Sequence, residues 1–455
     1  MINHSDTITA VVTPPGRGGV SIIRLCGPTL EPFFEALLGA KPSARRATLM
    51  AFLGVDHEVI DQGLVLYFPA PNSFTGEETL ELHAHGGPVV VDELLERITE
   101  LGARQARPGE FSERAFLNGK LDLAQAEAIA DLIDASTRQA ARGAVRTLKG
   151  EFSLKIKVLL DALTQLRVYT EAAIDFPEEE IDFLSDGKVE TELLEIIKQV
   201  GELLSSSTQG VLLQEGMRVA IAGRPNAGKS SLLNVLAGHE RAIVTDIPGT
   251  TRDILSEQIN LDGLVVHIID TAGLHDSVDV VEKEGMRRAW EEIAEADQIL
   301  WLVDGSQKGL TADTLIWSEY QQRYPERNNV SVVVNKADLF KQAVIDKHVD
   351  QTRPYIAISA LTGQGIDELK AHLKTLAGFT LAGEGVYSAR RRHILALNET
   401  LECLIAAQTQ LTGPGAGELV AEDLRQAQQH LGRITGLVTS DDLLGEIFSG
   451  FCIGK

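Results

Sequence analysis

The residues with the clearest chemistry are Gly223-Arg224-Pro225-Asn226-Ala227-Gly228-Lys229-Ser230, which match the pattern G-x-x-x-x-G-K-[ST]. In this pattern the glycines let backbone N–H groups curl around phosphate oxygens, the lysine reaches the β and γ phosphates, and the serine hydroxyl ligates magnesium. The apolar run Met217–Ala222 precedes the loop and the helix-like run Ser230–Ala237 follows it, so a helix N-terminus also faces the phosphates. The sequence therefore predicts a nucleoside triphosphate site. The alternative is a tight strand–helix turn without a ligand.

Two further motifs bear on which nucleotide binds. Asp270-Thr271-Ala272-Gly273 ends an apolar run, where an aspartate can hold a magnesium-bound water and a glycine amide can meet the γ-phosphate. Asn335-Lys336-Ala337-Asp338 ends another, and a carboxylate there can accept hydrogen bonds from guanine N1–H and the exocyclic amine. Adenine lacks this pair of donors, so Asp338 favours GTP, with Ser359-Ala360-Leu361 as a supporting base contact. The domain resembles Ras-like GTPases of the translation-factor class.

The catalytic apparatus departs from the Ras pattern, because the residue after Gly273 is Leu274. Ras-type enzymes have a glutamine there that orients the attacking water, and an arginine finger accelerates hydrolysis by about 10³- to 10⁵-fold. A leucine can do neither, so other groups must replace both functions.

Asn226 and Glu282 are the candidate replacements. An amide oxygen at Asn226 could ligate a monovalent cation beside the phosphates, with carbonyls of residues 245–253 closing the cage and Thr251 binding magnesium. The alternative for Asn226 is a loop residue that bonds its own backbone. Glu282, at the start of the predicted helix Glu282–Ala296, could position water through a bridging solvent molecule, or could simply be an acid favoured near a helix N-terminus.

These motifs lie in a region where apolar runs alternate with helix-like sequence, which predicts a parallel sheet with helices on both faces. The runs are Met217–Ala222, Leu264–Ile269, Gln298–Val303, Ser331–Val334 and Tyr355–Ile358. The flanking sequence is helical; for example, Leu121–Glu171 contains no proline and repeats apolar residues three and four apart. The acidic segment Ile174–Asp186 is predicted to be an exposed link.

The N-terminal region has a different pattern, with short β-like runs broken by glycine and proline and the helix-like run Val89–Leu101 among them. We therefore predict a multidomain chain of three fold types. Residues 1–119 form an α+β domain, residues 120–214 and 383–455 form an all-α helical domain, and residues 215–382 form an α/β domain inserted into it.

The composition limits the partners. The chain has 455 residues, 42 Lys+Arg and 65 Asp+Glu, a net charge of −23. This excludes a uniformly basic nucleic-acid coat, since phosphate binding relies on clustered Lys and Arg. Cys26, Cys403 and Cys452 are too scattered for a disulfide framework or a zinc site. With no signal-peptide pattern and no apolar run near 18 residues in length, we expect a cytoplasmic protein that does not cross a membrane.

Over essentially its full length the sequence resembles the bacterial tRNA-modification GTPases of the MnmE (TrmE) family. The resemblance rests on Asn226 and on the stretches Thr13–Gly19, Asn72–Glu77, His85–Pro88, Arg107–Phe116, Asp122–Glu127, Pro248–Asp253 and Phe451–Lys455. One position departs from the family, which usually has arginine where this chain has His275. An imidazole is shorter and only fractionally charged near neutral pH, which calls into question any dimerisation role at this position.

The resemblance implies a homodimer built through N-terminal domains that resemble folate-binding domains. It also implies GTP hydrolysis triggered when two G domains meet around potassium. The implied potassium positions are Asn226, Thr245, Ile247 and Thr250. The implied magnesium ligands are Ser230 and Thr251, and the implied catalytic glutamate is Glu282.

The implied folate positions are Arg24, Glu81, Lys120 and Lys455, which by themselves would be surface charges. Cys452 lies in the C-terminal motif, where it has a chemical role or is simply a small apolar residue. The residues predicted to contact GTP are Asn226, Ala227, Gly228, Lys229, Ser230, Ser231, Thr245, Asp246, Ile247, Pro248, Gly249, Thr250, Thr251, Asp270, Thr271, Ala272, Gly273, Asn335, Lys336, Asp338, Ser359, Ala360 and Leu361.

By this resemblance we expect a GTPase that acts with an FAD-dependent partner on certain tRNAs. Together they would add a (carboxymethyl)aminomethyl group to carbon 5 of the wobble uridine, taking a one-carbon unit from formyl- or methylene-tetrahydrofolate. The alternatives are a regulatory or ribosome-assembly switch and a nucleotide-gated scaffold. The basic cluster Arg390–His393 is interpreted as a solvated helix start rather than a tRNA contact.

Overall fold

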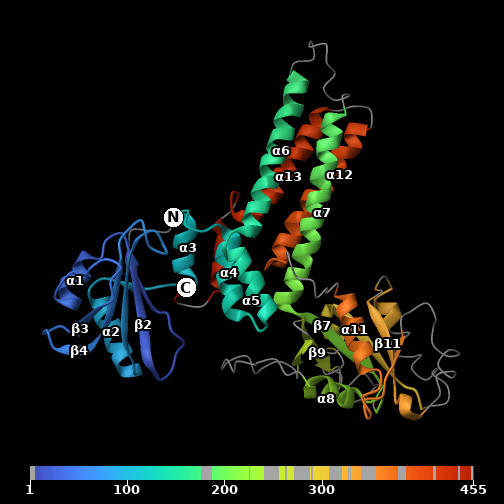
Figure 1. Cartoon of the computed structure of the whole chain (residues 1–455), viewed down its shortest axis with the longest axis horizontal. Coiled ribbons are helices and arrows are strands. Elements are labelled where there is room, and N and C mark those ends of the chain that lie inside the picture. The colour runs from blue at the N-terminus through green and yellow to red at the C-terminus, as the bar shows by residue number, and fades with distance from the viewer. Residues whose placement is uncertain are drawn as a thin grey trace. The chain divides into compact units, whose positions relative to one another are not determined.

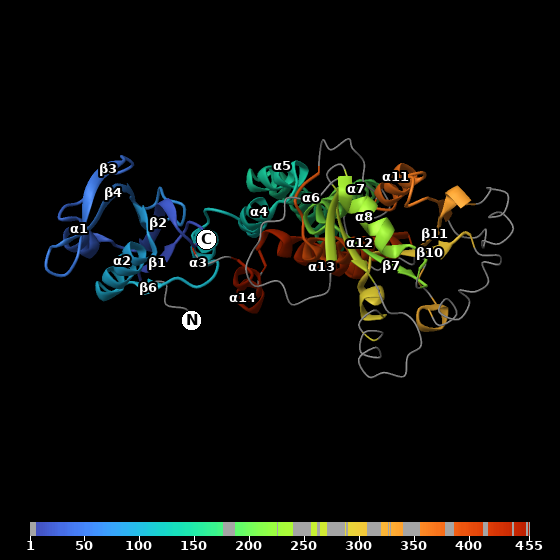
Figure 2. The ribbon, with the colours of Figure 1, turned by 90° about the horizontal axis from the view of Figure 1, so that it is seen from below.

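The computed structural model describes residues 6–175, 187–224, 226–239, 256–261, 264–270, 287, 290–306, 320–325, 327, 329–339, 355–377, 386–412, 417–438, 441–451 and 454 (Figures 1 and 2). The chain divides into two compact units. One comprises Met1–Ala130, Thr147–Val200 and Ala396–Lys455, and the other comprises Asp131–Arg146 and Gly201–Leu395. Among the described helices, none has a stretch long and apolar enough to span a bilayer.

The first sheet has six strands in the order β3-β4-β5-β2-β1-β6, and all neighbours are antiparallel except β1 and β6. The strands are β1 (Ile8–Val11), β2 (Gly18–Gly27), β3 (Thr48–Leu53), β4 (Val59–Phe68), β5 (Glu78–Gly86) and β6 (Arg104–Gln105). Helices α1 (Glu31–Leu38) and α2 (Pro88–Glu100) pack on this sheet around one hydrophobic core. The predicted α+β character of the N-terminal region is confirmed.

Alternation along β2 and β5 decides which residues face this core. Leu80 and Leu82 of β5 are fully buried, as are Ile23 and Leu25 of β2. Because successive strand residues point to opposite faces, the polar side chains between these leucines and isoleucines are displayed together on the other face of the sheet.

The region predicted to be helical folds as consecutive helices with identifiable ends. They are α4 (Leu123–Asp134), α5 (Arg138–Leu148), α6 (Glu151–Asp175), α7 (Lys188–Glu215), α12 (Arg391–Thr412), α13 (Gly417–Thr435) and α14 (Asp441–Ser449). Helix α3 (Glu110–Leu117) precedes them, within residues 1–119. Asp122 and Gln125 cap α4 reciprocally, since each side chain accepts the other's backbone N–H at 2.9 and 3.0 Å. Thr137 caps α5 by accepting the N–H of Ala140 at 3.1 Å. The predicted link between α6 and α7 lies mostly outside the described residues.

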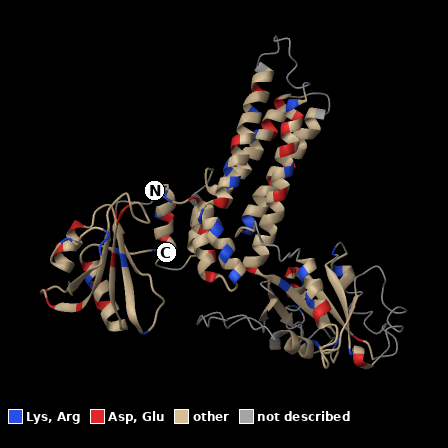
Figure 3. Cartoon of the chain, in the orientation of Figure 1, with Lys and Arg blue, Asp and Glu red and all other residues tan. Residues whose placement is uncertain are grey.

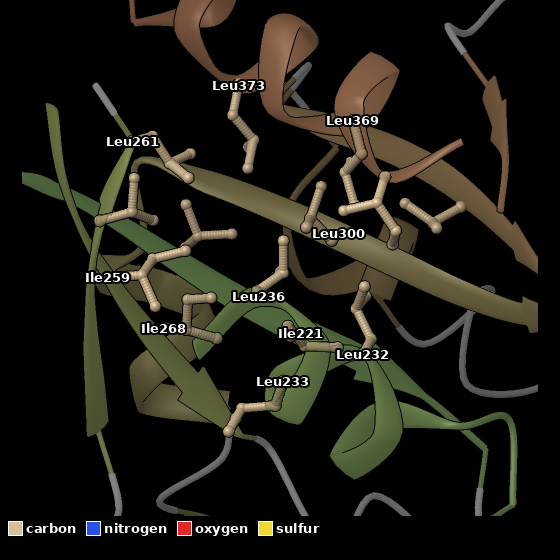
Figure 4. Packing of buried hydrophobic residues seen from close by; sticks show 14 of the residues in the cluster. Ile221, Leu232, Leu233, Leu236, Ile259, Leu261, Ile268, Leu300, Leu369 and Leu373 are labelled. Atoms are coloured by element: carbon tan, nitrogen blue, oxygen red, sulfur yellow. The ribbon is translucent and has the colours of Figure 1, made fainter. Parts of the chain in front are cut away.

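The second sheet carries the nucleotide motifs. Its order is β12-β11-β10-β7-β9-β8, and neighbours are parallel except β8 and β9. The strands are β7 (Met217–Gly223), β8 (Ser256–Leu261), β9 (Leu264–Asp270), β10 (Gln298–Asp304), β11 (Val330–Asn335) and β12 (Tyr355–Ala357). Helices α8 (Lys229–His239) and α11 (Ile366–Leu376) contribute to one core (Figure 4), and Trp290 and Tyr320 belong to a second core. The antiparallel strand β8 was not among the predicted strands.

The chain leaves and re-enters the helical part at one polar junction. Asp131 of α4 is 4% exposed and accepts hydrogen bonds from Ser388, Gln214 and Arg390. The expected helix start at Arg390–His393 is present, because α12 begins at Arg391. Its description as solvated is wrong for two members, since Arg390 pairs with Asp131 and His393 is 1% exposed.

Candidate functional site

The carboxyl ends of four parallel strands meet at one edge of the second sheet. Strand β7 lies between β9 and β10, and it ends at Gly223, whereas β9 ends at Asp270. Asp304 and Asn335 are paired neighbours at the ends of β10 and β11. Ligands of open α/β sheets bind outside this edge. The fold therefore brings the phosphate loop and the Asn335–Asp338 motif to one place, from positions more than a hundred residues apart.

The phosphate loop has the conformation of a cradle. Gly223, Asn226 and Gly228 have φ angles of 144°, 65° and 97°. A Cβ at Gly228 would lie 2.2 Å from Asn335 Nδ2, and one at Gly223 would lie 2.3 Å from the carbonyl oxygen of Leu302. Glycine is therefore required at both positions, and asparagine tolerates the left-handed region better than most residues. A loop bent in this way presents its N–H groups to an anion, so these residues fit a phosphate group.

The charged and amide side chains of the loop have distinct environments. Lys229 Nζ donates hydrogen bonds to the carbonyl oxygens of Gly223 (2.7 Å) and Arg224 (3.2 Å), so the ammonium group closes over the loop. The Asn226 side chain is exposed and bonds no group in the described part of the chain, so its alternative as a self-bonded loop residue finds no support there. Ser230 and Ser231 are also exposed, at the start of α8.

Asn335 connects the phosphate end of the site to the base end. Its Nδ2 donates to the carbonyl oxygen of Ala227 (2.9 Å), and its Oδ1 accepts from the N–H groups of Lys336 (2.8 Å) and Ala360 (3.0 Å). The residue is 2% exposed. Asn335 therefore holds two loops in register through its side chain.

Asp338 is the exposed member of the base-recognition motif. Its Oδ1 accepts a hydrogen bond from Ser359 Oγ at 2.6 Å. Within the described residues its Oδ2 has no protein donor, which leaves the carboxylate able to accept the paired donors of guanine. Ala360 is buried beside it, and the Leu361 side chain is 87% exposed.

Asp304 is a site residue that sequence reasoning missed. Its Oδ2 lies 2.6 Å from Lys336 Nζ. Burial raises the pKa of this carboxyl, but hydrogen bonds from Lys336 and Ser306 lower the pKa by more than burial raises it. The pKa is therefore below its ordinary value. The available signal was the position of Asp304 directly after the predicted strand Gln298–Val303.

Part of the predicted site lies outside the described residues. This holds for Pro225, Thr245, Asp246, Ile247, Pro248, Gly249, Thr250, Thr251, Thr271, Ala272, Gly273, His275, Glu282, Cys452 and Lys455. Asp270 is described through its backbone alone. Residues 290–295, within the predicted helix Glu282–Ala296, are helical.

On the first sheet, Arg24 and Glu81 face each other across β2 and β5. The register pairs them directly, and the Nε and Nη2 atoms of Arg24 lie 2.9 and 2.8 Å from Glu81 Oε1. The guanidinium carbon lies 5.5 Å from the ring centroid of Phe111 and 5.9 Å from that of Phe74. The other carboxylate oxygen of Glu81 lies 3.7 Å from His83 Nε2. Two charges predicted separately thus form one ion pair on the face opposite the hydrophobic core.

A buried network of charged groups supports this face. Arg114 of α3 is 2% exposed, and its Nη1 and Nη2 atoms lie 2.9 Å from Glu77 and 2.7 Å from Asp6. Glu110, also nearly fully buried, accepts two hydrogen bonds from Arg104 at 2.8 and 2.5 Å. The network joins α3 to Asp6, which precedes β1, to Glu77, which precedes β5, and to Arg104 of β6. It thereby holds in place Phe111, which lies on the same helix.

Cys26 lies at the inner end of this network. Its Sγ is 2.9 Å from Thr75 Oγ1 and donates to Glu77 Oε2 at 3.2 Å. Burial raises the pKa of the thiol to about 12, so Cys26 is a protonated structural group at neutral pH. Cys403 is likewise a free thiol.

Of the two remaining folate positions, Lys120 is described and Lys455 lies outside the described residues, although Gly454 before it is described. Lys120 is exposed, and a Cβ at Gly76 would lie 3.4 Å from its Cε atom. Gly454 is buried with a φ of 98°, and a Cβ there would lie 2.6 Å from the carbonyl oxygen of Val11. Since β1 pairs with β2, the C-terminal segment reaches the sheet that carries Arg24.

Two family models match the chain. One described as the MnmE helical domain matches residues 123–452, and one described as the GTP-binding protein TrmE N-terminus matches residues 7–120.

The chain is also similar in part to solved structures of GTPase domains. The G domain of the T. maritima FeoB iron transporter is 25% identical, with 35% of this chain and 98% of that chain covered and a TM-score of 0.27. An Aquifex aeolicus Era variant bound to GDP and aluminium fluoride is 28% identical, with 41% and 66% covered and a TM-score of 0.28. Translation elongation factor SelB from Methanococcus maripaludis, in complex with a GTP analogue, is 22% identical, with 36% and 34% covered and a TM-score of 0.26.

Proposed function

This chain belongs to the MnmE (TrmE) family and is a GTP hydrolase of tRNA modification, and from that premise we propose a more specific function. The chain is a homodimeric, potassium-dependent GTPase that acts with an FAD-dependent partner on the wobble uridine of certain tRNAs. The partners install a (carboxymethyl)aminomethyl group on carbon 5, using a one-carbon unit carried by a reduced folate.

The observation that carries the GTPase part is the assembly around Asn335. One buried amide holds the phosphate loop through Ala227 and the base loop through Ala360. At the base end Asp338 accepts the hydrogen bond of Ser359, and at the phosphate end Lys229 closes the loop. This arrangement fits a guanine nucleotide lying along the sheet edge.

In hydrolysis, Lys229 and the loop N–H groups hold the β and γ phosphates, and Ser230 and Thr251 hold magnesium. The exposed Asn226 amide is available to a potassium ion, with Thr245, Ile247 and Thr250 as the other ligands. Cations held by these residues would offset the negative charge that develops on the phosphates, a role that an arginine finger has in other GTPases. Glu282 orients the attacking water.

The domain division that we propose is 1–119, 120–214, 215–382 and 383–455. Helix α7 ends at Glu215, and β7 begins two residues later, which supports a boundary there. The junction at Asp131 binds both Gln214, before the inserted domain, and Ser388, after it. Dimerisation would use residues 1–119.

For the folate, the first sheet offers groups of suitable chemistry. Glu81 can accept the donors of a pterin edge, and the cations Arg24, Lys120 and Lys455 can bind the glutamyl carboxylates. The Arg24–Glu81 pair is half-buried beside Phe74 and Phe111, and Gly454 brings the C-terminal segment to the same sheet.

The test is quantification of modified wobble uridine, by mass spectrometry of nucleosides, in a strain that lacks this chain. We expect the carbon-5 modification to disappear, to return with the wild-type chain and to remain absent with Lys229→Ala. Unchanged modification in the deletion strain would reject the proposal in favour of a regulatory or ribosome-assembly switch.

A further inference from the structure

Helix α5 carries a row of arginines that no function described above uses. Arg138, Arg142 and Arg146 are spaced four residues apart, and the sequence from residue 135 to residue 150 contains no acidic residue. The stretch is therefore locally basic although the chain has a net charge of −23, and blue bands mark it in Figure 3.

The burial pattern of α5 places these arginines on one outer face. Ala140 and Ala144 are buried at 8% and 0% exposure, whereas Arg138 and Arg142 are exposed. A repeat of four residues turns only about 40° around a helix, so the two exposed guanidinium groups share a face and start about 6 Å apart along its axis. This separation suits neighbouring phosphates of one nucleic-acid strand.

The inner face of α5 is held against the chain that returns from the GTPase domain. A Cβ at Gly143 would lie only 3.3 Å from the backbone nitrogen of Ser388. The guanidinium of Arg146 lies over the ring of Tyr387, 5.0 Å from its centroid. These contacts fix the rotation of the helix about its axis, so the outer arginines are presented in a constant direction.

The outer arginines also lack the partners that cations have on other helices. On α13, Arg425 lies 2.7 Å from Glu422, and Arg433 lies 3.2 Å from Glu399 of α12. Among the described residues, no carboxylate lies within 4.0 Å of Arg138 or Arg142. The two nearest acids of α4 do not neutralise them, since Asp131 is occupied by Arg390 and Asp134 forms no ion pair with described residues.

We propose that the outer face of α5, formed by Arg138 and Arg142, is a tRNA-contact surface that binds the phosphate backbone. Guanidinium groups bind phosphates in a bidentate manner, and an acidic protein directs a polyanion to its few basic surfaces. The occupant is RNA because the chain belongs to a tRNA-modification family. The choice of tRNA as the ligand of this surface rests on the proposed function, whereas the exposed basic face of α5 does not.

The test is tRNA binding by the full-length chain with Arg138→Gln and Arg142→Gln combined, measured from 50 to 300 mM potassium chloride. Each lost phosphate contact reduces the slope of log affinity against log salt by about 0.7 to 0.9, so we expect a slope smaller by about 1.4 to 1.8. At 100 mM salt the affinity should fall by roughly tenfold or more. A transcript without wobble uridine should be affected equally, because backbone contacts carry no sequence information.

The matched control is Lys157→Gln combined with Lys198→Gln, which removes the same charge from exposed positions on α6 and α7 that have no ion pair with described residues. Its salt slope should equal that of the wild type. Both double variants should keep the wild-type unfolding midpoint.

The outcomes separate the two proposals. If the wild-type chain binds no tRNA, both the surface and the tRNA function are overturned. If the wild type binds and the Arg138/Arg142 variant binds with an unchanged slope, only the α5 surface is overturned. An unchanged slope together with a lost flavoprotein complex would assign α5 to an acidic protein partner instead.

Discussion

Gly228 lies where two loops of the GTPase domain meet, and its missing side chain leaves room for Asn335. The amide Nδ2 of Asn335 occupies the space in which a Cβ would lie, while also bonding Ala227. The same glycine has a left-handed φ of 97°. Two separate requirements, for space and for backbone conformation, therefore fall on one residue.

We expect Gly228→Ala to lower the affinity for GDP by about tenfold or more, because strained left-handed backbone costs about 1–3 kcal/mol and the clash adds to it. Isothermal titration with GDP measures this directly. Gly238→Ala is the matched control, since Gly238 lies on α8, the helix that directly follows Gly228, and a Cβ there would meet nothing within 4 Å. The control should bind GDP within about twofold of the wild type. Equal affinity in both variants would show that the Gly228–Asn335 contact does not shape the site.

At the scale of elements, the charged network around Arg114 attaches α3 to the first sheet. Arg114 bonds Asp6 before β1 and Glu77 before β5, and Arg104 of β6 bonds Glu110 of α3. Removing one partner of a buried ion pair leaves an uncompensated buried charge, which costs about 3–5 kcal/mol. The position of α3, and of Phe111 beside Arg24, thus depends on electrostatics as well as on packing.

We therefore expect Arg114→Met to destabilise the N-terminal region by about 3–5 kcal/mol. Denaturant-dependent hydrogen exchange of amides in residues 6–119 measures this region separately from the rest. Arg46→Met, at an exposed arginine without an ion pair to described residues, should change stability by less than about 0.5 kcal/mol. A loss of similar size in both variants would contradict the role of the network.

The same network makes stability depend on pH in a defined direction. Burial raises the pKa of Asp6 and Glu110, but hydrogen bonds from Arg104 and the other partners lower each pKa below its ordinary value. A carboxyl with a depressed folded pKa contributes stability that is present above its unfolded pKa and is lost as pH falls. The wild-type N-terminal region should therefore lose stability below about pH 4.5. Arg114→Met should lose less over that interval, because part of the linkage is already gone.

At the scale of the whole molecule, the net charge of −23 opposes the approach of two copies, and the proposed potassium ions would act where the G domains meet. A specific cation site must be separated from general screening, which depends on ionic strength and is the same for sodium and potassium. Comparison of the two salts at equal concentration makes that separation.

We expect GTP hydrolysis to be strongly depressed when sodium replaces potassium, and to fall when the proposed dimer is diluted below its dissociation constant. Asn226→Ala should lose most of the potassium stimulation and keep GDP binding, because this amide bonds no described protein group. Steady-state rates and GDP titrations test both statements. Equal rates in the two salts would remove the cation site, and loss of all nucleotide binding would make Asn226 a structural loop residue.

Much of the fold was predictable because its signals are local. Apolar runs such as Met217–Ala222 and Gln298–Val303 became β7 and β10 with ends within one residue of the prediction. Strand β8 was missed because it is an edge strand with the sequence Ser256-Glu257-Gln258-Ile259-Asn260-Leu261, which has no continuous apolar run like those of the predicted strands. The helix start at Arg391 was predicted, but the burial of His393 depends on neighbours from distant segments.

The sequence by itself determined the phosphate loop, the preference for guanine and the family, since each depends on residue types at short spacing. Only the tertiary structure decided that Arg24 pairs with Glu81 and that Asn335 joins two loops. It also decided that Asp131 accepts hydrogen bonds from Gln214 and Ser388, on the two sides of the inserted domain. These contacts join residues from 25 to 257 positions apart. Pairings at that range are set by sheet register and helix packing, which no local pattern contains.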